Sequence, residues 1–210
     1  MFELLKDGGP IMVLIFACGF AAAAVFLERL FHLHRAQIHV PDFIDGLFNV
    51  MRAGHVTEAV TLCESTPGPV ARLLRAAVLH HEAPAAEVRR AVEDAGRAEI
   101  PRIERRVNVL ATIAHIAPLL GLLGTVLGML EVTAAIRATA PLAHAGDLAG
   151  GLWRALLTTA AGLAVAIPSA AAYNVLLARI DALLLDMETA ASEVNVFLAR
   201  LRRTGPEAGR

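Results

Sequence analysis

Two long runs without charged residues constrain the fold of this chain more than any other feature. Residues 107–130 read VNVLATIAHIAPLLGLLGTVLGML and residues 155–178 read ALLTTAAGLAVAIPSAAAYNVLLA. Neither run contains Asp, Glu, Lys or Arg, and an apolar run of about 18 residues is long enough for a membrane-spanning helix. Both are rich in Gly, Ala and Thr, and small residues let helix backbones approach closely in a bilayer. We therefore expect two membrane helices that pack against each other.

The composition supports a membrane protein and argues against several other classes. Of the 210 residues 56% are hydrophobic, and the mean hydropathy is +0.58. The basic residues flank the apolar runs and form no patch with aromatic residues, so we expect no nucleic-acid partner. Cys18 lies in an apolar segment and Cys63 in a polar one, which argues against a structural disulfide. No phosphate-binding loop, nucleophile motif or zinc spacing is present, so we expect no enzyme, cofactor or metal site.

A third apolar segment lies near the N-terminus, from Pro10 to Leu27, and is followed by Glu28 and Arg29. The residues before it are more acidic than basic, whereas several basic residues follow it. This distribution is typical of an uncleaved helix whose C-terminal end is cytoplasmic. With three spans, all Lys and Arg residues lie on the cytoplasmic side or in its tail except Lys6, Arg137 and Arg154. The positive-inside rule thus places the N-terminus outside and the C-terminus inside.

The fold that we predict is an all-α membrane protein with three transmembrane helices and long helices that extend into a cytoplasmic helical domain. Its expected parts are a periplasmic N-terminus (1–9), a first span (10–29), the cytoplasmic domain (30–106), a second span (107–131), a periplasmic loop (132–151), a third span (152–178), and a cytoplasmic C-terminal helix and tail (179–210).

The cytoplasmic domain contains several helical patterns. We expect helices at 41–51, 57–65, 70–81 and 84–106, with a turn at residues 66–69. The last helix is expected to run without a break into the second span, with a kink at Pro101. After the third span, apolar residues recur at helical spacing and predict a long packed helix: Leu176, Ile180, Leu183, Met187, Val194, Phe197 and Leu201.

Small and polar residues form one stripe on each core span, and polar groups inside a membrane need an explanation. On the second span Gly121, Thr125 and Gly128 share a face. On the third span, beside Thr158, a comparable stripe contains Thr159, Gly162, Ala166, Ser169 and Tyr173. Such stripes either line a narrow polar path or form a tight contact in which each hydroxyl bonds to its own helix. The residues alone leave both interpretations open.

Neither core span contains a carboxylate, although a protonmotive device needs a group that exchanges protons within the membrane. His115 lies in the cytoplasmic half of the second span, about 80° around the helix from Thr125. It is either a proton relay or a hydrogen-bonded packing residue. Arg154, at the outer mouth of the third span, either reaches the outer head groups or faces a wet interior. If this chain moves protons, another chain must supply the acid.

These residues carry a family resemblance. The segment APLLGLLGTV at 117–126 with Gly128 and Met129, and ALLTTAAGLAVAIP at 155–168 with Tyr173 and Asn174, closely resemble the two core helices of the MotA/TolQ/ExbB proton-channel family. The segment STPGPVARLL at 65–74 resembles the cytoplasmic region of that family. Three spans with a modest cytoplasmic domain are similar to the ExbB/TolQ branch.

The resemblance implies a function and partners. It implies a homopentamer in the bacterial inner membrane, whose second and third helices line a pore around single-span ExbD/TolR-type helices that carry a membrane Asp. A TonB- or TolA-like protein is a further implied partner, and the implied ion is H⁺. Such a subunit uses the protonmotive force to energise outer-membrane transport or envelope processes.

Thr125 and Thr159 match the pore threonines of the family. The full set that we expect along the proton path is Gly121, Thr125, Gly128, Thr158, Thr159, Gly162, Ala166, Ser169 and Tyr173, with Arg154 and His115 as accessory residues.

Two positions depart from the family pattern. Arg154 stands where the family often has Glu, and His115 stands where a small or apolar residue is usual. A cation at that mouth would repel protons or pair with a different partner acid. This cation leads to one alternative, a non-conducting helical membrane scaffold or assembly protein. A second alternative is a gliding-type motor subunit, because the resemblance implies that such systems share the same motor.

Overall fold

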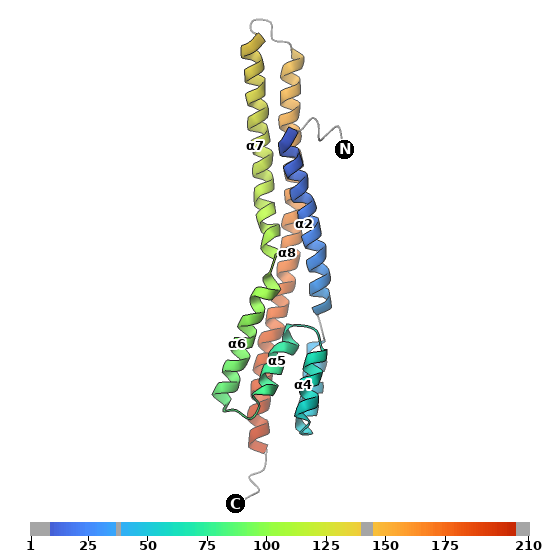
Figure 1. The fold of residues 1–210 in the computed structure, drawn as a ribbon, viewed down its shortest axis with the longest axis vertical. Coiled ribbons are helices and arrows are strands. Elements are labelled where there is room, and N and C mark those ends of the chain that lie inside the picture. Colours follow the sequence, from blue (N-terminus) through green and yellow to red (C-terminus); the bar gives the residue numbers. More distant parts are fainter. Residues whose placement is uncertain (1–8, 37–38, 140–144, 205–210) are drawn as a thin grey trace, which may run out of the picture. The chain divides into compact units, whose positions relative to one another are not determined.

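The computed structural model describes residues 9–36, 39–139 and 145–204, and the all-α prediction is confirmed. Every regular element in these ranges is a helix (Figure 1). The helices are α2 (Gly9–Ala36), α3 (Val40–Arg52), α4 (Val56–Ser65), α5 (Pro69–Leu79), α6 (Ala85–Glu104), α7 (Val107–Thr139) and α8 (Ala145–Thr204).

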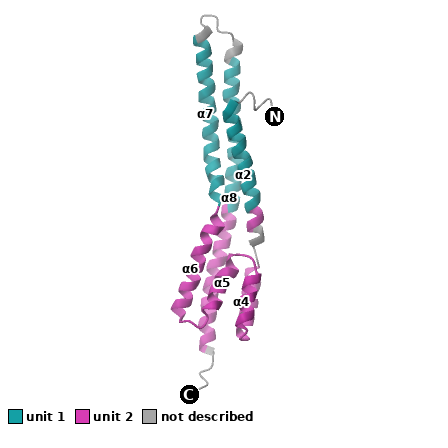
Figure 2. Cartoon of the chain, in the orientation of Figure 1, with its two compact units in different colours: residues 1–29, 106–176 teal, residues 30–105, 177–210 magenta. Residues whose placement is uncertain are grey.

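The chain divides into two compact units, which Figure 2 colours separately. Unit 1 comprises residues 1–29 and 106–176, and unit 2 comprises residues 30–105 and 177–210. The helices α2 and α8 each contribute to both units.

Unit 1 consists of α7, most of α2 and the first part of α8. The prediction of three spans is confirmed in that Gly9–Leu33, Ala85–Arg137 and Ala149–Arg203 are long and apolar enough to cross a membrane. Their outward faces carry large apolar side chains, and Phe20, for example, is 81% exposed. Such a surface is unfavourable in water but matches the hydrocarbon interior of a bilayer.

Unit 2 consists of α3 to α6 and the end of α8, with α5 packed between α4 and α6. Its core is built from large aliphatic side chains such as Leu47 and Leu74, which are fully buried. The apolar stripe predicted for the C-terminal helix is also largely buried. Within it, the ring of Phe197 stacks on that of Phe48 in α3, with ring centroids 4.0 Å apart.

Ion pairs join neighbouring helices of unit 2. Arg75 of α5 lies 2.6 Å from Glu64 of α4, and Arg72 of α5 lies 2.7 Å from Glu99 of α6. Arg202 of α8 donates hydrogen bonds to the carbonyl oxygens of His81 and Ala83, in the turn between α5 and α6. Side-chain burial and these polar links together hold unit 2.

The junction between α6 and α7 corrects one prediction. The helix does not continue through residues 104–107: Arg105 is extended (φ −51°, ψ 132°) and Arg106 has a φ of 67°. Pro101 lies inside α6 and lacks the N–H that would bond the preceding turn, which weakens the end of this helix. Arg106 also forms an ion pair with Glu28 of α2 at 2.5 Å, within unit 1. A left-handed conformation is unfavourable for a residue with a Cβ, by about 1–2 kcal/mol, and an ion pair as exposed as this one contributes only about 0–1 kcal/mol, so the pair offsets part of that cost.

The segment 132–151 was expected to be a loop, but most of it is helical. Helix α7 continues to Thr139 and α8 begins at Ala145, and residues 140–144 lie outside the described ranges. Ala-rich sequence on both sides explains the extension, because Ala has the highest helix propensity. The periplasmic location of this segment stays a prediction, as do the other membrane boundaries.

Candidate functional site at the contact of α7 and α8

Helices α7 and α8 meet through glycines whose positions leave no room for a side chain. A Cβ added at Gly121 would lie 3.0 Å from Thr159 Cα, and one at Gly124 would overlap the Thr158 side chain. A Cβ at Gly128 would lie 2.9 Å from atoms of α8. Spacings of three and four residues place these glycines on one side of α7. The two helices therefore touch at backbone distance, which is the packing that lipid favours.

The same contact is visible from α8. A Cβ at Gly162 would lie 2.6 Å from the carbonyl oxygen of Ala117, and one at Gly151 would overlap the Val132 side chain. Close packing thus extends from Ala117 to Val132 along α7.

Two of the predicted threonines bond to their own helix. Thr158 is 1% exposed, and its Oγ1 donates to the carbonyl oxygens of Ala155 at 2.9 Å and Arg154 at 3.1 Å. Thr125 is half-buried, and its Oγ1 donates to the carbonyl oxygen of Leu122 at 2.6 Å. For these two threonines the structure shows hydrogen bonds to their own helix, which is one of the two interpretations that the sequence left open.

Thr159 differs because its hydroxyl bonds across the contact. Its Oγ1 donates to the carbonyl oxygen of Gly121 on α7 at 3.1 Å, and the side chain is half-buried. A hydroxyl that donates one bond keeps its acceptor lone pairs. Thr159 can therefore link α7 to α8 and still accept a bond from water or a protonated group.

Thr125 and Thr159 lie on the same side of the helix pair. Thr125 follows the contact residue Gly121 by four residues, and Thr159 follows Ala155 by four, so each lies about 40° around its helix from a contact position. In an antiparallel pair the same rotation on both helices leads to the same side. The register of the glycine contacts places the two threonines about one helical turn apart along the axis.

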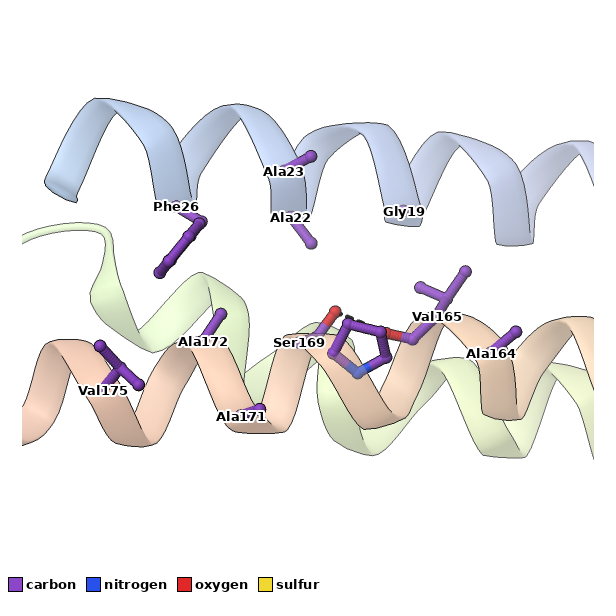
Figure 3. Close-up of a pocket in the computed structure, with 11 residues that line it drawn as sticks. Gly19, Ala22, Ala23, Phe26, Ala164, Val165, Ser169, Ala171, Ala172 and Val175 are labelled. Carbon is purple, nitrogen blue, oxygen red and sulfur yellow. Dashed lines mark hydrogen bonds between the residues drawn. The ribbon is translucent and has the colours of Figure 1, made fainter. Parts of the chain in front are cut away.

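Helix α2 packs on the opposite side of α8. A Cβ at Gly19 of α2 would lie 3.1 Å from Val165, and Val165 is about 120° around α8 from Thr159. An apolar groove of about 530 Å³ lies between these two helices, and Figure 3 shows Ala22 and Phe26 of α2 on one side of it. Ser169 lines the groove, but its hydroxyl donates to the Val165 carbonyl at 2.7 Å. The groove has no charged lining residue, so it does not resemble a path for ions.

Arg154 has a partner that the sequence analysis did not anticipate. Its Nη1 donates to Oε2 of Glu131 on α7 at 2.7 Å, and both side chains are about half exposed. Glu131 lies within α7, which stays helical to Thr139, past the end of the second span that the sequence predicted at residue 131. The cation at this end of the hairpin is therefore matched by an acid from the same chain.

His115 makes a local bond. Its side chain is exposed, and Nδ1 lies 2.6 Å from the carbonyl oxygen of Ala111 one turn earlier. A carbonyl oxygen only accepts, so Nδ1 carries the proton in this arrangement. A role as a proton relay stays a prediction.

The remaining predicted residues take different places. Gly121, Gly128, Thr158 and Gly162 lie in the contact between α7 and α8, and Ala166 and Ser169 are also buried in unit 1. Tyr173 is half-buried. Whether these residues line a pore depends on an assembly of several chains, so their pore-lining role stays a prediction.

Sequence reasoning missed Gly124, Gly151 and Glu131. Gly124 lies three residues after Gly121 and four before Gly128, so helical spacing alone could have placed it in the contact. Gly151 was assigned to the loop 132–151, so only a helical interpretation of that segment would have revealed it, whereas Glu131 was the last residue of the predicted second span and was not singled out.

Comparison with known proteins gives consistent matches. The model of the MotA/TolQ/ExbB proton channel family matches residues 65–189. A biopolymer transport protein ExbB homolog of Methanothermobacter thermautotrophicus is 31% identical over 182 residues, covering 86% of this chain but only 64% of that protein. The ExbB-like protein 3 of Synechocystis sp. is 30% identical over 169 residues and 80% of each chain. TolQ of the Haemophilus influenzae Tol-Pal system is 39% identical over 111 residues, covering 53% of this chain and 48% of TolQ.

Proposed function

The chain belongs to the MotA/TolQ/ExbB proton channel family, and from that premise we propose that it is the proton-conducting subunit of an ExbB–ExbD or TolQ–TolR type complex. It is a multi-pass membrane protein of the ExbB/TolQ branch, with three apolar helices. In this proposal it lies in the bacterial inner membrane with a periplasmic N-terminus and a cytoplasmic C-terminus. The complex uses the protonmotive force to energise outer-membrane transport or envelope processes, and the subunit is a channel component, not an enzyme.

The observation that carries the proposal is the common side of Thr125 and Thr159. Both hydroxyls lie within about one turn of each other on the side of the α7–α8 pair that faces away from the α2 packing site. Their hydroxyl protons are donated to the carbonyl oxygens of Leu122 and Gly121, so each hydroxyl oxygen keeps its acceptor lone pairs. Two acceptors a turn apart suit a narrow path for protonated groups or water.

The proposal requires a partner for the titrating group. Residues 107–130 and 155–178 contain no carboxylate, so the membrane acid comes from a single-span ExbD/TolR-type helix that carries an Asp. The assembly is a pentamer around that partner, the ion is H⁺, and a TonB- or TolA-like protein receives the work. The protonmotive force can supply work to that partner, because one charge that crosses 100 mV releases about 2.3 kcal/mol.

The scaffold alternative depended on a repelling cation at the mouth of the path. The ion pair of Arg154 with Glu131 removes that reason, since the pair is neutral as a unit. A gliding-type motor would use the same conducting hairpin and would differ in its partner proteins.

The test is proton flux into liposomes that contain the chain assembled with an ExbD-type partner. Thr125→Val and Thr159→Val keep the side-chain shape and remove the hydroxyl, so we expect flux to fall about tenfold or more, the effect of one lost hydrogen bond of roughly 1.4 kcal/mol. Thr133→Val is the matched control, because its exposed hydroxyl also bonds to its own helix on α7, to Met129 O. Unchanged flux in both core variants, with assembly intact, would contradict the pore assignment.

A further inference from the structure

Glu131 and Arg154 form an ion pair that links α7 to α8 near the turn of the hairpin. Their closest atoms are 2.7 Å apart. Between residues 107 and 137 of α7 the charged side chains are Glu131 and Arg137, and between residues 149 and 178 of α8 Arg154 is the charged one. The two opposite charges thus meet in an otherwise largely uncharged pair of helices.

We propose that this pair is a clasp that sets the register of α7 against α8 and so positions Thr125 and Thr159, without itself touching the transported ion. The consequence for ion transport rests on the proposed function, whereas the clasp itself rests on the geometry of the hairpin.

The position of the pair along the hairpin suits a clasp. Glu131 lies one turn beyond Gly128, and Arg154 directly precedes Ala155, which a Cβ at Gly128 would contact at 2.9 Å. The carbonyl oxygen of Arg154 also accepts a hydrogen bond from the Thr158 hydroxyl. The pair therefore closes the end of the same close contact that holds Thr159 against Gly121.

The ion pair and the two threonines, Thr125 and Thr159, lie on opposite sides of the contact between α7 and α8. Glu131 is about 120° around α7 from Thr125, and Arg154 is about 140° around α8 from Thr159, on the other side of the contact strip in both cases. On α8 that is also the side that meets α2, through Val165. A charge there does not face the side on which the hydroxyls lie.

The contact itself sets part of the register, since the Thr158 side chain lies against Gly124 and the Val132 side chain lies against Gly151. The ion pair adds a second determinant of the register near the turn of the hairpin. A charged group in or near hydrocarbon is costly when it has no partner. A slide by one turn separates Glu131 from Arg154 and incurs that cost at both ends, so the register in which they meet is selected.

The test is a set of charge reversals in the full chain assembled with an ExbD-type partner, measured by thermal unfolding and by proton flux as a function of pH. Arg154→Glu and Glu131→Arg each place like charges together, and we expect a lower unfolding temperature and at least a tenfold loss of flux. The exchanged pair, E131R with R154E, should restore the unfolding temperature and return flux to within about twofold of the parent with an unchanged pH profile. Arg137→Glu is the control, since it reverses a charge on α7 outside the clasp.

The outcomes separate the possibilities. If the exchanged pair regains stability but not flux, or shifts the pH profile, the charges act on the ion and the proposal is overturned. It is also overturned if the single reversals leave both readouts unchanged. If the reversals do not fold, Glu131→Gln and Arg154→Gln replace them, and parental stability in both contradicts the clasp.

A failure of the proposed function has a different signature. If the parent complex conducts no protons, the channel assignment fails, and the clasp is still judged by whether the exchanged pair regains the unfolding temperature lost in the single reversals.

Discussion

The helices inside unit 1 and the helices inside unit 2 are held together by opposite kinds of packing. In unit 1, α7 and α8 touch at glycines such as Gly121, and large side chains such as Leu119 point outward. In unit 2, large side chains such as Leu74 point inward, and charged residues such as Glu99 join neighbouring helices.

The difference follows from the two solvents. Lipid tails are as apolar as Leu, so burying Leu between membrane helices gains little, and close backbone approach provides the attraction instead. In water each Å² of buried apolar surface contributes about 25 cal/mol, so large buried side chains provide the attraction between the helices of unit 2. Added volume should therefore harm unit 1 most, and removed volume should harm unit 2 most.

The largest expected effect is from Gly124→Val. The new side chain overlaps Thr158, and we expect a loss of about 3 kcal/mol or more in stability, because two packed backbones must separate. Thermal unfolding of the purified protein in detergent measures it. Gly150→Val is the control, since a Cβ there meets nothing within 4 Å. Combining Gly124→Val with Thr158→Gly should regain part of the loss; no recovery would argue against this contact.

In unit 2 the removal of side-chain volume is expected to lower the stability. Phe197 is 8% exposed and stacks on Phe48, so Phe197→Ala should cost about 3 kcal/mol. Hydrogen exchange of the full chain should show lost protection in α3 and the end of α8. The neighbouring Val196 is 48% exposed, and Val196→Ala should change stability by less than about 0.5 kcal/mol. Equal effects at the two positions would contradict the packing described here.

In unit 2 the loss of two arginines should destabilise the fold more than the loss of the charge on Glu99, with which they pair. The Glu99 side chain is 5% exposed, whereas its partners Arg72 and Arg102 are 50% and 67% exposed. Replacing both arginines by Met leaves a buried carboxylate without a partner and should cost about 2 kcal/mol, more than the roughly 1 kcal/mol of Glu99→Gln, which leaves the arginines in water. Denaturant unfolding compares the variants, and the opposite order would show that Glu99 is not the costly member.

The smallest effect concerns Cys63. Burial raises the pKa of its thiol to about 11 from 9.0, so at pH 8 its thiolate is about 100-fold scarcer than in an unfolded chain. Maleimide labelling in a Cys18→Ser background should be correspondingly slow until denaturant is added. Because the folded state holds the proton more tightly, the stability contributed by the neutral thiol is complete below pH 9 and declines between about pH 9 and 11. Cys63→Ala should remove this decline, and fast labelling of the folded protein would contradict it.

Much of the fold could be predicted from the sequence. The charge-free runs and the stripe from Leu176 to Leu201 are long periodic patterns, and such patterns identify helices reliably. The break at Arg105 and Arg106 could not be predicted, because the local pattern is helical and the ion pair with Glu28 is made by a residue 78 positions away. The helix beyond residue 131 was missed because its polar and small residues also suit a loop.

The candidate site divides in the same way. Helical geometry alone showed that Gly121, Thr125 and Gly128 share a face. It left open whether the neighbouring hydroxyl groups bond to their own helix or line a polar path. The tertiary structure decided that Thr158 is enclosed, that Thr159 bonds to Gly121 on the other helix, and that Arg154 meets Glu131.

The sequence by itself determined which segments prefer lipid and which side of each helix is narrow, because hydropathy and periodicity are properties of the local chain. The register of α7 against α8 was decided only in the tertiary structure. It depends on atoms that meet across the hairpin, such as those of Gly121 with Thr159, Gly124 with Thr158 and Glu131 with Arg154, and these residues lie far apart in the sequence.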